Sequence, residues 1–375
     1  TDANHSDVVT SANGNVVLRT TAGDLTLSEG TATGAGQSVN ANGSGNVLLQ
    51  AIAGAVVIGQ NADVVTATGH LTVLGATSVE LKAGGDLRST SGTIDVESSA
   101  AVLMSDTSLI TSAGHLRVVG ATNVTLGGLL TTSNASVIAT SGSILDGGDA
   151  LVDVVAAGVQ LTAGSGVGTG ADHIETTVAT LTAVSGAGGV YVLESDGLTV
   201  GDVAVTVSKV GVQGTAAAVT DANRSDVVTS ANGNVVLRTA AGDLTLSEGT
   251  ATGAGQSVNA HGSGNVLLQA IAGAVVIGQN ADVVTATGHL TVLGATSVEL
   301  KAGGDLRSTS GTIDVESSAA VLMSDTSLIT SAGHLRVVGA TNVTLGGLLT
   351  TANASVIATS GSILDGGDKI GRAHV

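Results

Sequence analysis

Two carboxylates that stand two positions apart are the residues of this sequence best suited to catalysis by type and spacing. They are Asp95 and Glu97, with Lys82 and Arg88 on neighbouring segments. If their segment is a β-strand, both side chains leave it on the same outward face, because side chains alternate in direction along a strand. Two carboxyl groups held ~5 to 9.5 Å apart can cleave a glycosidic bond, one as acid and the other as base or nucleophile.

The alternative for this pair is a solvated polar face. The pair recurs as Asp314 and Glu316, and an active site copied into each repeat would be unusual. Tyr191 is the one aromatic residue of the chain, so side chains that stack on sugars are scarce. We therefore predict no catalytic residues, and we predict that the protein is not an enzyme.

Four histidines occur in the same Gly-His-Leu context, where a strand is predicted to start: His70, His115, His289 and His334. If His70 and His115 are separated by two layers of stacked strands, their imidazoles are about 10 Å apart. Histidine binds a metal ion at ~2.0 to 2.1 Å, so one ion could not reach both. We predict no metal site, and the spacing supports no Ser-His-Asp arrangement.

Two fragments come nearest to calcium-binding motifs, Gly84–Asp86 and Asp146–Asp149. Neither completes the Gly-Gly-x-Gly-x-Asp ladder of calcium-binding repeats, and loops of the EF-hand type are missing. We predict no cofactor, with weak calcium binding at Gly-Asp corners as the open alternative.

Two further motifs are interpreted as structural. Residues 34–36 and 168–170 (Gly-x-Gly) lack the lysine and the following helix of a phosphate loop, so they are predicted to be corners. Residues 31–33 and 66–68 (Thr-x-Thr) have the composition of an ice-binding ladder, but the motif does not recur in successive layers. Ice binding is not expected.

A long tandem duplication organises the chain. Residues 1–149 recur at 220–368, an offset of 219. We define a first repeat unit, 1–219, and a second, truncated unit, 220–368; residues 369–375 resemble a translated sequencing adapter and are predicted to be a non-native tail. The two copies differ at four pairs of positions: His5/Arg224, Thr21/Ala240, Asn42/His261 and Ser133/Ala352. Near-identity over this length indicates an array.

The composition favours a narrow β-rich core. The chain has no Cys, Pro, Trp or Phe, while 55 of its 375 residues are Gly, so Ala, Val, Leu and Ile must fill the interior. A formal charge of −18 opposes binding to nucleic acid and to anionic membranes. No apolar run reaches the ~18 to 20 residues that span a bilayer.

Short strand-like segments separated by Gly-bearing corners are expected throughout the unit. The clearest are 15–19, 24–28, 46–50, 55–58, 70–74, 78–81, 93–97 and 101–104. The Gly-rich stretches 163–171 and 211–219 are expected to form a loop or a loosened coil.

A weaker repeat is nested inside the unit. Residues 69–81 align with 114–126 at an offset of 45, and nine of thirteen positions match. The matched apolar residues Leu71, Val73, Val79 and Leu81 reappear as Leu116, Val118, Val124 and Leu126, whereas the positions between them vary. Strand alternation places the matched set inward and the variable set outward.

This pattern predicts an all-β parallel β-helix (solenoid) with Gly-rich corners. The offset of 45 corresponds to two coils of about 22 residues, with two or three strands each, and to roughly ten coils per unit. The alternative is a string of β-sandwich domains, but the spacing of strands is shorter and more regular than sandwiches require.

The segments SANGNVVLRTTAGDLTLSEG and SGNVLLQAIAGAVVIG resemble repeats of giant bacterial surface or secreted adhesin-like proteins, the filamentous-haemagglutinin-like β-strand-repeat group. The resemblance covers residues 1–368. It implies a right-handed β-helical stalk, extracellular or on the bacterial cell surface, that projects a distal binding region. Partners would be host-cell or matrix glycans or proteins, bound through regions outside this fragment.

Two other functions remain open. One is a carbohydrate-active β-helix enzyme, which predicts a single groove that differs from its copies. The other is an array of repeated weak ligand sites. A passive stalk predicts equivalent surfaces at intervals of 219 residues.

Overall fold

The computed structural model describes residues 7–30, 37–148, 150–251 and 256–367. These residues form an all-β structure without helices, a parallel β-solenoid of about 14 turns. The same residues accordingly contain no helix that could cross a membrane. The predicted solenoid is confirmed, and the string of β-sandwiches is wrong, because successive coils pair in parallel. Handedness stays a prediction of the family resemblance.

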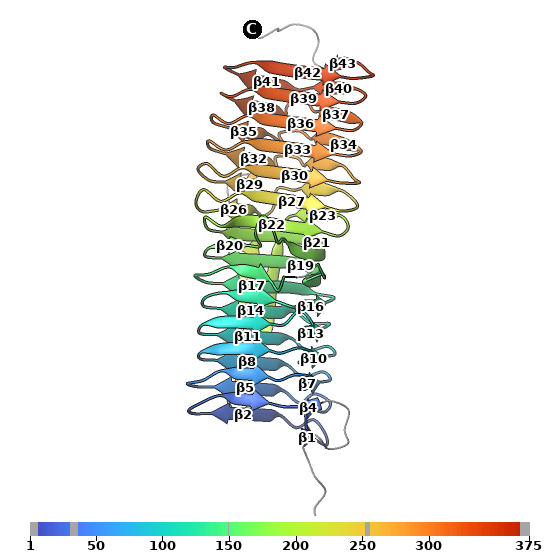
Figure 1. Cartoon of the computed structure of the whole chain (residues 1–375). Helices are drawn as coiled ribbons and strands as arrows, with labels where there is room; N and C mark the ends of the chain where they lie inside the picture. Colours follow the sequence, from blue (N-terminus) through green and yellow to red (C-terminus); the bar gives the residue numbers. More distant parts are fainter. Residues whose placement is uncertain (1–6, 31–36, 149, 252–255, 368–375) are drawn as a thin grey trace, which may run out of the picture. The chain divides into compact units, whose positions relative to one another are not determined.

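The chain divides into two compact units. Each unit is defined by contacts within the fold, and its boundaries differ from those of the duplicated sequence. Unit 1 comprises Thr1–Val178 and Val203–Asn223, and unit 2 comprises Ala179–Asp202 and Arg224–Val375. In each unit a regular coil contributes three short strands, and equivalent strands of successive coils pair to form three parallel ladders (Figure 1).

The strands of unit 1 are these. The first ladder contains β1 (Val8–Thr10), β4 (Gln37–Ala41), β7 (Asp63–Thr66), β10 (Leu87–Ser89), β13 (Leu109–Ser112), β16 (Gly128–Thr131) and the start of β19 (Val154–Ala163). The second contains β2 (Val16–Thr20), β5 (Val47–Ala51), β8 (Leu71–Gly75), β11 (Ile94–Ser98), β14 (Leu116–Gly120), β17 (Asn134–Ala139) and the end of β19. The third contains β3 (Leu25–Leu27), β6 (Val56–Ile58), β9 (Ser78–Leu81), β12 (Ala101–Met104), β15 (Val124–Leu126), β18 (Ile144–Asp146) and β20 (Gly166–Val167).

The strands of unit 2 follow the same scheme. The first ladder contains the end of β21 (Ile174–Ser185), β26 (Val227–Thr229), β29 (Gln256–Ala260), β32 (Asp282–Thr285), β35 (Leu306–Ser308), β38 (Leu328–Ser331) and β41 (Gly347–Thr350). The second contains β22 (Gly189–Glu194), β27 (Val235–Thr239), β30 (Val266–Ala270), β33 (Leu290–Gly294), β36 (Ile313–Ser317), β39 (Leu335–Gly339) and β42 (Ala354–Ala358). The third contains β23 (Leu198–Val200), β28 (Leu244–Leu246), β31 (Val275–Ile277), β34 (Ser297–Leu300), β37 (Ala320–Met323), β40 (Val343–Leu345) and β43 (Ile363–Asp365).

The core of each unit is a stack of small branched side chains. Leu71 pairs with Ile94, which pairs with Leu116, so the offset of 45 residues spans two coils as predicted. The matched apolar set of the nested repeat is fully or almost fully buried. Each such side chain contributes roughly 1.5 to 3 kcal/mol through burial, and only the neighbouring coils can cover it.

A second stack, of hydroxyl groups and glycines, closes one corner of the coils. Thr66 Oγ1 donates to the carbonyl of Gly45 at 2.7 Å, and Ser89 Oγ donates to that of Gly69 at 2.8 Å. A Cβ atom on Gly92 would lie 1.8 Å from the carbonyl oxygen of Gly69, so this corner accepts only glycine. Because Thr66 is buried in this stack, its Thr-x-Thr motif cannot form an ice-binding ladder.

The coils contain three strands, within the two or three expected, but the first-ladder strands were not among the segments predicted. In most of them the second inward side chain carries a hydroxyl group, as Ser89 does in β10, so no apolar alternation marks the strand. Coil length also varies, from 19 residues between paired Ile110 and Leu129 to 31 between paired Val8 and Val39. It reaches 44 between paired Ala183 and Val227, where residues 203–223 leave the coil. Residues 8–200 consequently form eight coils, fewer than the ten expected for one repeat.

Not all of the single-copy segment after residue 149 joins the coils. Strands β24 (Val203–Val210) and β25 (Ala216–Arg224) form a separate two-stranded sheet. The Gly-rich stretch 211–219, expected to be a loop or a loosened coil, supplies the turn and the start of β25. We call Val203–Asn223, the part that belongs to unit 1, the hairpin.

Candidate functional site

The hairpin packs across the second ladder of unit 1. Strand β24 contacts β8, β11, β14, β17 and β19. One side of β24 is apolar and buried, with Val203, Val205 and Val207 packed together and Val219 of β25 against them. Gly158 permits the close approach, since a Cβ there would lie 3.2 Å from Val203 Cγ2.

Hydrogen bonds to successive coils fix the position of the hairpin. The N–H of Val210 donates to Thr72 Oγ1 at 2.8 Å, and the N–H of Ser208 donates to Thr93 Oγ1 at 2.8 Å. Asn46 Nδ2 donates to the carbonyl of Gly214 at 2.9 Å, and Asn134 Nδ2 donates to that of Ala204 at 3.0 Å. Each of these four bonds joins the hairpin to a different coil.

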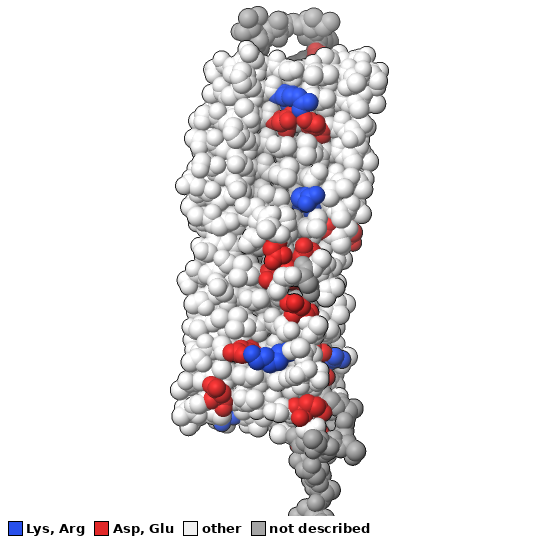
Figure 2. Space-filling view, viewed as in Figure 1, with Lys and Arg blue, Asp and Glu red and all other residues white. Residues whose placement is uncertain are grey.

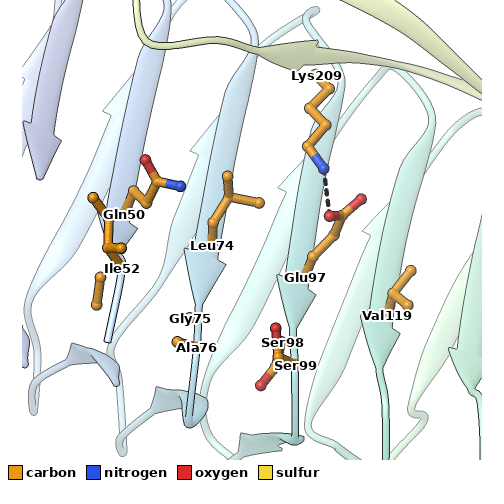
Figure 3. Close-up of a pocket in the computed structure, with 11 residues that line it drawn as sticks. Gln50, Ile52, Leu74, Gly75, Ala76, Glu97, Ser98, Ser99, Val119 and Lys209 are labelled. Atoms are coloured by element: carbon orange, nitrogen blue, oxygen red, sulfur yellow. Dashed lines mark hydrogen bonds and ion pairs between the residues drawn. The ribbon is translucent and has the colours of Figure 1, made fainter. Parts of the chain in front are cut away.

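A charge cluster lies between the hairpin and β11. Arg117 Nη1 donates to Asp95 Oδ1 at 3.0 Å and to Glu97 Oε1 at 2.5 Å, while its Nε donates to Asp221 of β25 at 3.1 Å. Lys209 of β24 completes the cluster with an ion pair to Glu97. Figure 3 shows the Lys209 side chain extending from the hairpin strand to Glu97. Three acidic groups thus share two cations.

Burial and neighbouring charges shift the pKa values of this cluster in opposite directions. Burial, followed by the charge of Glu97, raises the pKa of Asp95 to about 6 despite the opposing effect of Arg117. Burial also works against ionisation of Glu97, but the bonds from Lys209 and Arg117 lower its pKa overall. Burial by itself lowers the pKa of Arg117, but the carboxylates of Asp95 and Asp221 outweigh it, and the pKa is raised overall.

The predicted carboxylate pair therefore shares a strand but not an environment. Asp95 has a fully buried side chain under the hairpin, so the solvated interpretation is wrong for it, whereas the side chain of Glu97 is 26 % exposed. The neighbouring cations do not join them, since Lys82 pairs with Glu80 and Arg88 with Asp86. No motif pointed to Lys209 or Asp221, which are more than 100 residues away along the chain.

An open groove of about 320 Å³ runs beside this cluster. Its lining includes Gln50, Leu74, Glu97, Val119 and Lys209 (Figure 3). An equivalent groove of about 300 Å³ occurs in unit 2, where Gln269, Leu293, Glu316 and Val338 take the same positions. The groove recurs at the interval of 219 residues, and Lys209 is the feature that distinguishes the first copy.

The histidines lie where the sequence predicted, immediately before second-ladder strands. His70 precedes β8, and its Nδ1 accepts the N–H of Thr93 at 3.0 Å. Burial lowers the pKa of His70. His115 precedes β14, which is two coils away from β8. These side chains act as links between neighbouring coils.

Three carboxylates that no motif connects meet in unit 1. One oxygen each of Asp146, Asp153 and Glu175 lies within 4.8 Å of the others, and Asp146 Oδ2 is buried without a hydrogen-bond partner. Burial, then the charge of Asp146, raises the pKa of Asp153 to about 9. Oxygen ligands of this kind suit Ca²⁺. The sequence indicated only Asp146 of this group, because Asp153 and Glu175 reach it through strand register.

The other predicted fragments do not form sites. Asp86 Oδ1 accepts the N–H of Leu109 at 2.9 Å and Oδ2 binds Arg88 at 2.5 Å, so Gly84–Asp86 is a structural corner. Gly168 follows β20 with a positive φ of 60°, as a corner requires. Residues 31–36, Asp149 and 369–375 lie outside the described residues.

Comparisons of the chain with protein-family models, with curated proteins and with solved structures find no match. We therefore infer function from the fold and from these sites.

Proposed function

We propose that this chain is a structural stalk segment of a large adhesin-like protein of the bacterial cell surface, which projects a distal binding region. One observation carries the proposal: within each unit, equivalent strands pair in register from coil to coil around the same apolar stack. Such a repeat extends by addition, because each coil covers the apolar end of its neighbour.

The recurrence of the groove supports a stalk over an enzyme. An active site needs one constellation of groups that acts on one substrate, whereas the two grooves share their lining and differ at Lys209. In addition, Asp95 is enclosed with Arg117 and Asp221, where it cannot reach a sugar. A polysaccharide-depolymerisation assay on the full chain is the direct test of the enzymatic alternative.

The distribution of charge suits an extracellular spacer. Figure 2 shows one face on which acidic and basic side chains form small separate groups on an otherwise uncharged surface. Together with the net charge of −18, this surface disfavours association between stalks through like-charge repulsion. Host-cell or matrix glycans or proteins are the partners we propose for regions outside residues 1–368.

The test is the length of arrays built from one, two and four copies of the 219-residue repeat. Neighbouring coils are ~4.8 Å apart, so each added copy of eight coils is expected to add roughly 40 Å in electron micrographs. A length that does not grow by a constant increment would refute the stalk.

Repeated weak ligand binding is the second candidate, and the recurring groove favours it. A glycan array probed with the full chain tests this function, with Glu97→Gln and Glu316→Gln as matched variants. If each variant loses the same share of glycan binding, the result would support a repeated site. The prediction of weak calcium binding also stays open, and the carboxylate cluster of unit 1 is where it can be tested.

A further inference from the structure

The duplicated sequence presents the same outward face twice. The covered face of unit 1 is the outward side of its second ladder, at Leu48, Thr72, Asp95 and Arg117. Its counterpart in unit 2, the bare face, consists of Leu267, Thr291, Asp314 and Arg336. None of the four substitutions between the copies falls on these positions.

The two faces differ in exposure. Leu48, Thr72 and Asp95 are buried, whereas Leu267, Thr291 and Asp314 are each partly exposed. The side chain of Arg117 is 12 % exposed, and that of Arg336 is 44 % exposed. The alternating core positions of the same strands are buried in both copies. The difference is thus confined to the positions that the hairpin covers.

We propose that the bare face is a docking site for a second copy of the hairpin, which a further repeat of this sequence supplies. The proposal rests on the proposed function in so far as that function makes the chain part of an array. Each repeat would then be strapped by the hairpin that follows its coils along the chain.

The chemistry of the bare face matches this occupant. Arg336 binds Asp314 at 2.9 Å and also pairs with Glu316, as Arg117 does with Asp95 and Glu97. In unit 1 the hairpin adds Lys209 to the glutamate and Asp221 to the arginine. The same two charges would complement Glu316 and Arg336.

The backbone contacts can be repeated as well. Thr72 and Thr93 accept N–H groups of the hairpin, and the bare face has Thr291 and Thr312 in their places. Leu267 takes the place of Leu48, which is buried in unit 1. Every anchoring group from the duplicated coils is therefore present in unit 2.

The natural absence of cysteine permits a direct experiment. In Thr291→Cys we expect rapid labelling by a maleimide, and in Thr72→Cys slow labelling, because the hairpin covers residue 72. A chain in which residues 150–223 follow Asp368 should lower the labelling rate of Thr291→Cys by roughly tenfold or more. Leu322→Cys, whose position is exposed on the third ladder, is the control and should not change.

A charge exchange identifies the occupant. A labelled peptide of residues 203–223 should bind the full chain with a stoichiometry of one, because the covered face is already occupied. Glu316→Lys should weaken binding by roughly tenfold or more, and a peptide carrying Lys209→Glu should restore it. Glu299→Lys, the same charge change on the third ladder, should leave binding unaltered.

Unchanged labelling of Thr291→Cys in the extended chain, or peptide binding that is insensitive to Glu316→Lys, would overturn the proposal. Neither result affects the length of arrays, so the stalk would stand. Conversely, arrays that fail to lengthen would refute the stalk while hairpin docking remained measurable in the two-copy chain.

Discussion

Two copies of one sequence form the same coils but differ on one face, and the hairpin is the cause. Strands β11 and β36 both read Ile-Asp-Val-Glu-Ser and pair with equivalent neighbours. Nevertheless, Asp95 is fully buried, whereas the side chain of Asp314 is 35 % exposed. Local sequence thus fixes which way a side chain points, and a distant segment decides whether it meets water.

A buried charge tests most severely whether the two cores are equivalent. Val118→Asp and Val337→Asp each place a carboxylate in the apolar stack, where both valines are buried. Each change should lower the free energy of unfolding of its own unit by several kcal/mol, because an unpaired charge cannot be hydrated there. Thermal unfolding and limited proteolysis measure this loss. A much milder effect in one copy would show that the cores differ as well as the faces.

The arginine pair probes the faces themselves. Arg117→Ala leaves Asp95 buried without its cation and should cost about 3 to 5 kcal/mol. Arg336→Ala removes the equivalent ion pairs with Asp314 and Glu316, which are exposed to solvent, and should cost no more than about 1 kcal/mol. Chemical unfolding measures both losses of stability, and hydrogen exchange of the hairpin amides reports the loss at Arg117. Equal losses of stability in the two variants would contradict the expectation that the hairpin strengthens the ion pairs it covers.

The carboxylate cluster also depends on the single-copy segment, which supplies Asp153 and Glu175. Burial raises the pKa of Asp153 from 3.8 to about 9, so the folded chain retains a proton that the unfolded chain releases above about pH 4. The stabilising contribution of this group is complete below pH 4 and is lost as pH rises towards 9.

Asp153→Asn should abolish this pH dependence and should raise the unfolding temperature by a few degrees at pH 8. Millimolar calcium should stabilise the unaltered chain at pH 8 but not the variant. Asp365 is the equivalent of Asp146 in the second copy. Asp365→Asn is the matched control and should show neither effect. A calcium effect that survives in Asp153→Asn would exclude this cluster as the site.

The smallest expected effect concerns the two lysine pairs. Lys209 is 33 % exposed and joins the hairpin to Glu97, so Lys209→Ala should cost about 1 kcal/mol, seen mainly as faster hydrogen exchange in β24. Lys301 is 53 % exposed and pairs with Glu299 on a neighbouring position of the third ladder. Lys301→Ala should change stability by less than about 0.5 kcal/mol. A larger loss at Lys301 would reverse the order that burial predicts.

Much of the solenoid could be predicted because its rules are local. Leu71 and Val73, with Leu116 and Val118 two coils away, alternate with variable residues, and this period of two places them inward. The spacing of 45 residues gave the coil length because stacking demands that equivalent residues meet. Most first-ladder strands escaped prediction because their second inward residue carries a hydroxyl group, as Thr66 and Ser89 do, so no apolar alternation is visible.

The hairpin and the carboxylate cluster could not be predicted in this way. Val203–Val210 alternates like any coil strand, and its sequence does not reveal that it crosses the coils. Asp153 meets Asp146 because β18 and β19 occupy neighbouring coils, an outcome of register across an irregular turn. Both features depend on contacts between segments that have no shared motif.

The parallel coils, the inward apolar stack and the repeated surfaces follow from the order of residues alone, because side chains alternate along each strand and equivalent residues stack from coil to coil. The position of the hairpin over Thr72, Asp95 and Arg117, and the meeting of Asp146, Asp153 and Glu175, follow only from the folded chain. Burial of a charged side chain depends on the segment that packs over it, and for Asp95 that segment is the hairpin, more than 100 residues away in the chain.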